Sequence, residues 1–352
     1  MIPWTLCNNS LRLTAFLSAI LGLSGTVLGA DADSFKDKQI RVIVPTPAGG
    51  GYDLYARILA AHMPMHVPGN PTMIVQNMLG AAGLTATNYI YNAAPRDGTV
   101  IGAAHSSTST APLLSPQGAQ FDVTKMTWIG SVSSDAFVSY LWHTAPIQSL
   151  EDVKTKEAIV GGSAIGSASI DYAVIGKDLF GLKLKIITGY AGSTAVKLAM
   201  ERGEIHGTFG NMWSDLKAQQ PTWVPEKIVR VIVQFGLKKH PDLPDAPLFM
   251  ELAKTDTERQ ILELLLARQE YSKAYYGPPD IPPTRLNMLR RAFDATMKDP
   301  AFLAAMEKAK SPVDDPMTGE EVARIVTRVA ATPKSVVDRV QASFDNFKAG
   351  NK

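Results

Sequence analysis

The chain has 352 residues, of which 45% are hydrophobic and 19% are charged, and its formal net charge is +2. These values are typical of a folded globular protein of about two domains, and they exclude a disordered chain. They also exclude a broad basic surface for nucleic acid, because the pairs of Lys and Arg are scattered along the sequence.

An uncharged, largely apolar run extends from Leu13 to Ala30. This pattern predicts a cleavable signal peptide over residues 1–32, and therefore export to the periplasm. An uncleaved membrane anchor is the alternative, because a run of about 18 residues nearly spans a bilayer. The Ser, Gly and Thr residues within the run argue against a permanent span. The only cysteine, Cys7, would leave with the signal, so we expect no disulfide, zinc–cysteine site or cysteine nucleophile in the mature chain.

After this segment, short apolar strands alternate with helical patterns, which is typical of α/β domains with largely parallel sheets. A first set has helices at 53–63 and 84–92 and strands at 39–44, 73–76 and 99–104. A second set begins near Trp128, with helices between strands at 128–132, 137–143, 159–161, 184–188, 206–209 and 229–234. From about His240 the pattern becomes mostly helical, with candidate helices at 258–273, 284–297, 300–309 and 319–347.

Three glycine-rich turns that lead from a strand into a helix are candidate anion sites: residues 47–53, 80–83 and 162–167. Such a turn presents unpaired backbone N–H groups at the positive end of a helix dipole, and glycine lets an anion approach them. None of the three has the spacing of a dinucleotide fingerprint or of a phosphate loop ending in Gly-Lys-Ser/Thr. One such turn alone is usually only turn geometry. Turns from two separate sets could grip a small anion from both sides.

Further candidates lie at the carboxyl ends of strands, where open α/β sheets place their ligands. His105, followed by Ser106 and Ser107, ends the strand at 99–104, and a solvated strand end is the alternative interpretation for this histidine. The later strands at 184–188 and 206–209 are followed by Tyr190, Gly192, Ser193 and Asn211.

Catalytic and metal-binding patterns are weak. Ser163 and Ser167 lie among glycines but lack the Gly-Xaa-Ser-Xaa-Gly frame of a nucleophile elbow. His62 and His66 are four residues apart, but Pro64 would break the helical face that they need to share as metal ligands. We therefore predict no catalytic residue, no metal site and no cofactor.

Several of these segments together resemble the substrate-binding proteins of tripartite tricarboxylate transporters, the Bug-type periplasmic receptors. The segments that carry the resemblance lie along the whole mature chain, at residues 40–53, 77–83, 94–98, 162–167, 189–193, 276–286 and 299–300.

The resemblance implies a type II periplasmic-binding fold, in which two α/β lobes are joined by a double-crossing hinge. Residues 33–125 would form the first part of lobe 1, residues 126–235 lobe 2, and residues 236–352 a mostly helical return segment of lobe 1. It also implies a monomeric receptor without enzymatic activity. Such a receptor would close on a small di-, tri- or aromatic carboxylate and present it to the integral-membrane permease subunits of the transporter, and it would not bind nucleic acid.

The same resemblance and the strand ends together predict the ligand-binding residues. They are Pro47, Ala48, Gly49, Gly50, Gly51, His105, Ser106, Ser107, Ser163, Ala164, Gly166, Ser167, Tyr190, Gly192, Ser193 and Asn211. Asp53 is expected to cap its helix rather than to contact an anion. Two other functions stay open from the sequence: a secreted hydrolase or lyase on the same fold, and a ligand-sensing module for a membrane signalling partner.

Overall fold

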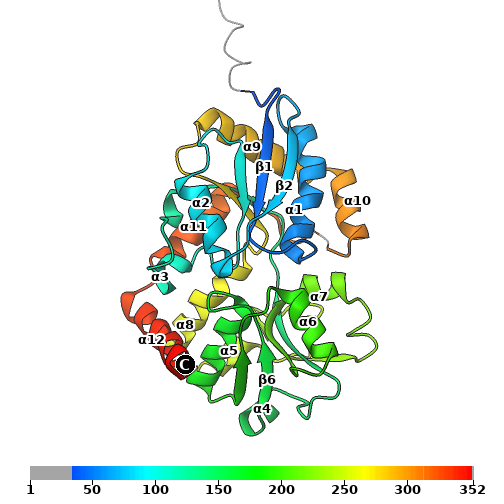
Figure 1. Cartoon of the computed structure of the whole chain (residues 1–352), viewed down its shortest axis with the longest axis vertical. Coiled ribbons are helices and arrows are strands. Elements are labelled where there is room, and N and C mark those ends of the chain that lie inside the picture. The colour runs from blue at the N-terminus through cyan, green and yellow to red at the C-terminus, as the bar shows by residue number, and fades with distance from the viewer. Residues whose placement is uncertain (1–33, 312, 351–352) are drawn as a thin grey trace, which may run out of the picture. The chain divides into compact units, whose positions relative to one another are not determined.

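The computed structural model describes residues 34–311 and 313–350, which form a mixed α/β structure with two sheets (Figure 1). The predicted signal peptide, residues 1–32, lies outside the described residues. Within the described ranges, no helix is long and apolar enough to cross a membrane.

The first sheet has the strand order β11-β4-β10-β3-β1-β2 and is the core of what we call the first lobe. β1 pairs in parallel with β2 and β3, whereas β10 runs antiparallel to β3 and β4. The strands are β1 (Gln39–Val44), β2 (Thr72–Asn77), β3 (Val100–Ala103), β4 (Thr127–Ser131), β10 (Ala274–Gly277) and β11 (Met317–Thr318). The helices of this lobe are α1 (Gly51–His62), α2 (Leu84–Asn92), α3 (Ala111–Leu114), α9 (Pro283–Thr296), α10 (Pro300–Lys308) and α11 (Gly319–Ala330). Because helices cover the sheet, β1 buries the continuous apolar run Val42, Ile43 and Val44 completely.

The second sheet has the order β7-β6-β8-β5-β9 and is the core of the second lobe. β6 pairs in parallel with β7 and β8, and β5 runs antiparallel to β8 and β9. The strands are β5 (Phe137–Trp142), β6 (Ala158–Gly161), β7 (Leu184–Ile187), β8 (Gly207–Met212) and β9 (Val229–Phe235). The helices are α4 (Asp152–Thr155), α5 (Ala168–Phe180), α6 (Ser193–Glu201), α7 (Trp213–Gln219) and α8 (Asp256–Leu266). Short 3-10 helices lie at Met63–His66, Ala81–Gly83, Val123–Lys125, Phe249–Leu252 and Ala267–Gln269.

The chain passes between the lobes from β4 to β5 and again from β9 to β10, as the predicted double-crossing fold requires. The last helix, α12 (Lys334–Gly350), then packs against α5 and α8 of the second lobe and against α3 of the first. The Gln341 side-chain amide donates to the carbonyl oxygen of Leu113 at 2.5 Å, and the Ser343 hydroxyl donates to Asp178 at 2.7 Å. The C-terminal helix therefore contacts both lobes.

Some sequence predictions were wrong in detail. The strand expected at 128–132 as part of the second lobe is β4, which pairs with β10 and β11 in the first sheet. We therefore place the first crossing after β4. The helix expected at 319–347 is two helices, α11 and α12, because Pro333 lies between them. The helix expected at 258–273 ends at Leu266 and continues only as a short 3-10 turn.

Candidate functional site

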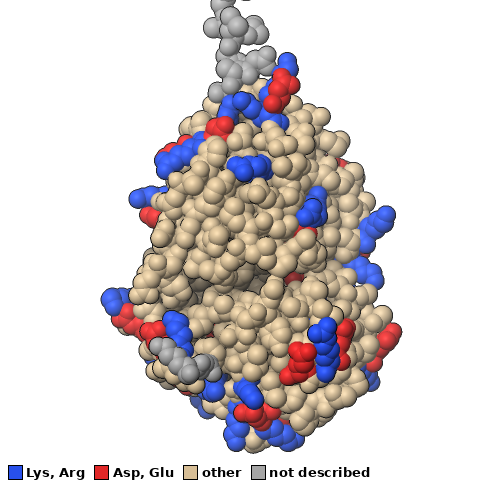
Figure 2. All heavy atoms as spheres, viewed as in Figure 1, with Lys and Arg blue, Asp and Glu red and all other residues tan. Residues whose placement is uncertain are grey.

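A cavity of about 650 Å³ lies between loops of the two lobes. Figure 2 shows the hollow in the surface, with the Lys, Arg, Asp and Glu side chains of this face mostly away from it. The first lobe contributes the turns after β1 and β2, and the second lobe contributes the turns after β6, β7 and β8. The carboxyl ends of the parallel strands therefore meet at one place, as open α/β sheets require of a ligand site.

Five helices begin at this cavity, and four of them have no capping side chain, whereas at α7 the N–H of Ser214 donates to the Asp135 carboxylate at 3.2 Å. The residues at their N-cap positions are Gly50 for α1, Gly83 for α2, Ser167 for α5, Gly192 for α6 and Met212 for α7. All five line the cavity, and none makes a side-chain cap hydrogen bond.

Helices elsewhere in the described chain show the contrast, because α8, α10 and α11 are capped by the side chains of Thr255, Asp299 and Thr318. The first N–H groups of a helix have no intrahelical acceptor and carry its positive dipole end. The cavity thus gathers several free peptide donors and an electrostatic potential that favours an anion.

The turn after β1 is held by a buried aspartate. The N–H of Gly49, whose φ is 81°, donates to the Asp53 carboxylate at 2.9 Å, and Arg57 and Asn77 donate to the same carboxylate. Burial of Asp53 opposes its ionisation, but these hydrogen bonds outweigh burial and lower the pKa of the carboxyl. The expectation that Asp53 caps its helix is wrong, because the N-cap of α1 is Gly50, which makes no side-chain cap hydrogen bond, and Asp53 lies in the first turn and binds the preceding turn instead. Asp53 does not line the cavity. Because Gly49 is engaged in this contact, its N–H is not free for a ligand.

The turn after β2 has unusual backbone angles. Gly80, Ala81, Ala82 and Gly83 have φ values of 138°, 47°, 51° and 89°. Left-handed conformations at two alanines are costly, and such strain is typical of ligand sites. Ser107 supports this turn from outside the cavity, since its hydroxyl donates to the carbonyl oxygen of Ala82 at 2.8 Å.

A buried ion pair holds the turn after β6 in place. The Gly166 N–H donates to Asp171 at 2.7 Å, and Asp171 pairs with Arg268 at 2.9 Å, with both side chains almost completely buried. The Ser167 hydroxyl donates to the carbonyl oxygen of Ala164 at 2.6 Å. Gly166 is therefore a structural residue of the turn. The hydroxyl of Ser167 also lies 3.3 Å from that of Ser169, and neither contact involves a histidine.

His105 lies in the cavity wall and is buried, so it is not a solvated strand end. Its ring stacks on that of Tyr52 with 5.7 Å between centroids, and its Nδ1 lies 2.9 Å from the Ser107 hydroxyl. Burial, together with the positive charge of Arg268, lowers the pKa of His105 to about 4. The imidazole is therefore neutral near pH 7 and can offer hydrogen bonds without adding charge.

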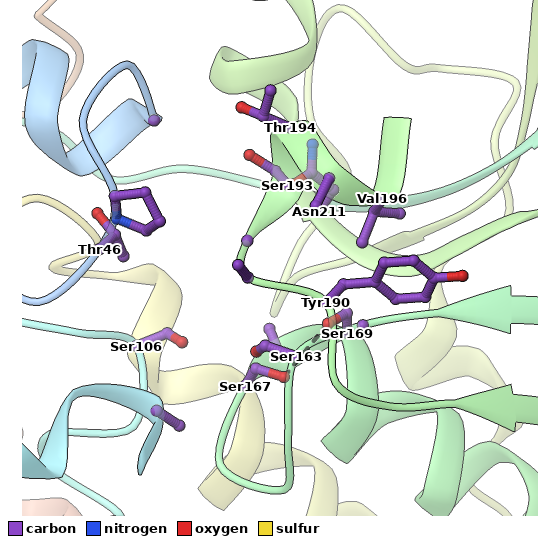
Figure 3. A pocket seen from close by; sticks show the side chains of 18 of the residues that line it. Thr46, Ser106, Ser163, Ser167, Ser169, Tyr190, Ser193, Thr194, Val196 and Asn211 are labelled. Atoms are coloured by element: carbon purple, nitrogen blue, oxygen red, sulfur yellow. Dashed lines mark hydrogen bonds between the residues drawn. The ribbon is translucent and has the colours of Figure 1, made fainter. Parts of the chain in front are cut away.

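Most of the predicted site residues meet at this cavity. Those that line it are Pro47, Ala48, Gly50, Gly51, His105, Ser106, Ser163, Ala164, Ser167, Tyr190, Gly192, Ser193 and Asn211. Three others, Gly49, Ser107 and Gly166, do not line it and instead hold its turns. Figure 3 shows Thr46 and Ser106 on one side of the cavity and Ser163, Ser167 and Ser193 across from them. Whether these residues bind a ligand stays a prediction.

Sequence reasoning missed several lining residues. The hydroxyl side chains of Thr46, Ser169 and Thr194 stand beside predicted positions, so a wider window around each turn would have included them. Asp215 also lines the cavity. No sequence signal pointed to it, because an acid is not expected in a site for anions.

The predicted absence of a metal site was based on the pair His62 and His66. In the structure His66 lies 2.9 Å from Asp299. Among the described residues, no group of three or more His, Cys, Asp or Glu side chains could hold a metal ion.

Comparison with known proteins gives a partial sequence match and a broad structural one. No protein-family model matches the chain. Protein BugT of Bordetella pertussis is 33% identical over 105 residues, and the matched segment spans only 30% of this chain and 30% of BugT. The structure of the periplasmic binding protein BugD has a TM-score of 0.67 at 20% identity, over 87% of this chain and 98% of BugD. MatC of Rhodopseudomonas palustris, solved with bound malate, has a TM-score of 0.67 at 17% identity, over 87% of this chain and 98% of MatC.

The structures of BugD and MatC align with this chain over 87% of its length. BugT, which matches part of the sequence, shares the Bug name with BugD. The predicted two-lobed α/β fold is therefore confirmed. The resemblance that the loops of the sequence predict is confirmed with it, and the chain is similar in sequence and fold to the Bug-type periplasmic binding proteins.

Proposed function

We propose that this protein is an extracytoplasmic solute-binding protein that captures a small carboxylate between its lobes and delivers it to the membrane subunits of a tripartite tricarboxylate-type transporter. The observation that carries the proposal is the convergence of four uncapped helix N-termini, those of α1, α2, α5 and α6, on one cavity. Such helix ends bind anions through backbone N–H groups.

The number of donors is sufficient for useful affinity. Each hydrogen bond to a charged group contributes roughly 1.5–3 kcal/mol. Three or four of them, less the cost of immobilising the ligand, would give a binding free energy of about −8 kcal/mol, which corresponds to a micromolar dissociation constant.

The comparisons support a carboxylate as the anion, because MatC, which shares the fold, was solved with malate. The predicted signal peptide supports a location in the periplasm. Donors from both lobes line the cavity, so a ligand would contact both of them only when they are together, and ligand binding would favour a closed arrangement.

A thermal-shift screen of the mature protein tests the proposal. The panel contains malate, citrate and benzoate as examples of di-, tri- and aromatic carboxylates, with the uncharged amide of each as the matched control. A carboxylate present at about 100 times its dissociation constant should add roughly 2.7 kcal/mol of stability and raise the melting temperature by several degrees. Equal shifts by acids and amides, or no shift with any carboxylate, would contradict the proposal.

Delivery to a transporter has its own test. Deletion of the gene should abolish uptake of the radiolabelled carboxylate that the purified protein binds, and expression from a plasmid should restore it. Unchanged uptake, combined with a lost transcriptional response to that carboxylate, would instead identify a sensor.

A further inference from the structure

The two lobes touch around the cavity at places where a glycine of one lobe faces the other lobe. A Cβ atom on Gly192 of the second lobe would lie 3.6 Å from Pro47 of the first, and one on Gly166 would lie 3.4 Å from Ala82. Side chains any larger than a hydrogen atom at these two glycines would therefore already be in van der Waals contact with the first lobe. The structure is that of a closed arrangement, in which the turns of the two lobes meet.

The contact at Gly51 is different, because a charged group takes part in it. A Cβ atom on Gly51, at the N-terminus of α1 in the first lobe, would lie 1.7 Å from Oδ1 of Asp215, in α7 of the second lobe. The same oxygen atom lies 3.5 Å from Nζ of Lys273, and the two side chains are 8% and 0% exposed. Lys273 also donates to the thioether of Met212 at 2.7 Å, which is a weak acceptor.

Lys273 is held by the first lobe. It directly precedes β10, and its carbonyl oxygen accepts a hydrogen bond from the N–H of Val132, next to β4, at 3.1 Å. Its ammonium group lies over the rings of Tyr52 and Tyr55 in α1, at 5.2 Å and 4.8 Å from their centroids. None of these contacts needs a group of the second lobe, so Lys273 would stay against α1 if the lobes parted.

Two further charged groups belong to this cluster, and neither takes the place of Asp215. Asp135, in the first crossing, lies 3.5 Å from Nζ of Lys273 and also accepts hydrogen bonds from the N–H and the hydroxyl of Ser214. Lys197, in α6, is buried and is attracted by Asp215. Because Lys197 and Asp215 lie in the same lobe, their attraction does not depend on whether the lobes are together. Within the cluster, Asp215 is the group that opening would carry away from Lys273.

The energetics favour the closed contact. Closure takes the Asp215 carboxylate out of water, which is costly unless partners of opposite charge compensate. Lys273 and the positive end of the α1 dipole both face the carboxylate there. Burial opposes the charge of Lys273, but Asp215 and Asp135 outweigh burial and raise the pKa of the lysine. Since Lys273 is already packed against α1, closure has to remove only one of the two charged groups from water.

We propose that Asp215 and Lys273 form an electrostatic latch that holds the two lobes closed in the absence of a ligand. The latch goes beyond the proposed function, because it concerns the resting state of the protein and does not depend on which solute the cavity takes. A protein held in this way admits a solute only while the latch is broken.

Distances between spin labels on the two lobes test the latch in the mature protein. The mature chain contains no cysteine, because the only one, Cys7, lies in the predicted signal peptide. Leu79→Cys and Leu198→Cys would place one label on each lobe, since these two leucines stand at the edge of the cavity and are 51% and 46% exposed.

The labelled protein is freed of any bound solute by unfolding and refolding, and native mass spectrometry confirms the removal. Electron–electron double resonance should then give mainly the short distance of the closed structure. A ligand-free protein with mainly longer distances would overturn the latch. Because no ligand is added, this result does not depend on whether carboxylates bind.

Variants of the cluster locate the effect. Asp215→Asn removes the charge with little change in shape, and it should raise the ratio of open to closed molecules about ten-fold or more. Lys197→Met is the matched control, because it removes a buried ammonium group beside Asp215 but from the same lobe, and it should leave the distances unchanged. Unchanged distances in Asp215→Asn, or equal opening in both variants, would overturn the latch. If Asp215→Asn does not fold, Lys273→Met removes the other half of the latch and must show the same opening.

Discussion

Replacing Ser193 with proline would show whether the N-terminus of α6 binds the ligand. Ser193 is the first residue of this helix and lines the cavity. Proline is favoured at the first helical position, because its fixed φ suits the helix and the N–H lost there has no intrahelical acceptor. Ser193→Pro therefore removes one free peptide donor from the cavity and leaves the hydrogen bonds of the helix in place.

The expected loss follows from the strength of one hydrogen bond to a charged acceptor. At roughly 1.5–3 kcal/mol, its removal should weaken binding about 10- to 150-fold. Titration calorimetry with the carboxylate that gives the largest thermal shift would measure the change. The melting temperature without ligand should stay close to that of the unmodified protein.

Two control variants separate the donor from other effects of the substitution. Ser193→Ala removes only the hydroxyl group. Asp256→Pro places a proline at the first position of α8, which does not contribute to the cavity lining. If Ser193→Pro binds the carboxylate as tightly as Ser193→Ala does, the N-terminus of α6 is not part of the site.

Three further predictions concern stability. Gly51→Ala should lower the melting temperature, with a cost of about 1–3 kcal/mol in stability, because the new Cβ would overlap the Asp215 carboxylate. Gly50→Ala is the control and should be tolerated, because its Cβ would meet its nearest atom at 3.4 Å. Equal melting temperatures of the two variants would contradict the contact between Gly51 and Asp215. Arg268→Met should lower the free energy of unfolding in urea by about 3–5 kcal/mol, because it leaves Asp171 buried without its cation, and the double variant with Asp171→Asn should recover part of this loss. The lowered pKa of His105, about 4 against 6.5 for the ordinary group, means that the unfolded chain takes up the proton first. The stability that the neutral ring contributes is thus complete above pH 6.5 and is lost as the pH falls towards 4. Over this range the free energy of unfolding should fall by up to about 3 kcal/mol more for the unmodified protein than for His105→Gln. Parallel curves of unfolding free energy against pH for the two proteins would refute this.

The local parts of the fold could be predicted from the sequence. β1, the glycine turn after it and the start of α1 follow from an apolar run, a glycine cluster and Asp53, all within fifteen residues of one another. Pairing between distant strands could not be predicted in this way. β4 has the same apolar pattern as a strand of the second lobe, and only its partners β10 and β11, from the far end of the chain, assign it to the first sheet.

The candidate site shows the same division between local and distant information. The turns that line the cavity have a sequence signal, because glycines and small hydroxyl residues follow each strand. The sequence does not show which N–H groups in those turns are already used. Gly49 and Gly166 donate to Asp53 and Asp171, respectively, so two of the predicted binding residues hold their turns in shape. Asp215 could not be expected, since its place in the wall depends on a contact with Gly51 in the other lobe.

The C-terminal helix restricts how the lobes can move relative to each other. α12 contacts α3 in one lobe and α5 and α8 in the other, so the segment between α11 and α12 acts as a third covalent strap beside the two crossings. A rigid rotation of one lobe that stretches none of these three connecting segments must have its axis close to all of them. Were the lobes to open, this arrangement would favour a clamshell-like rotation with its pivot near α12 over a sliding or twisting of one lobe across the other.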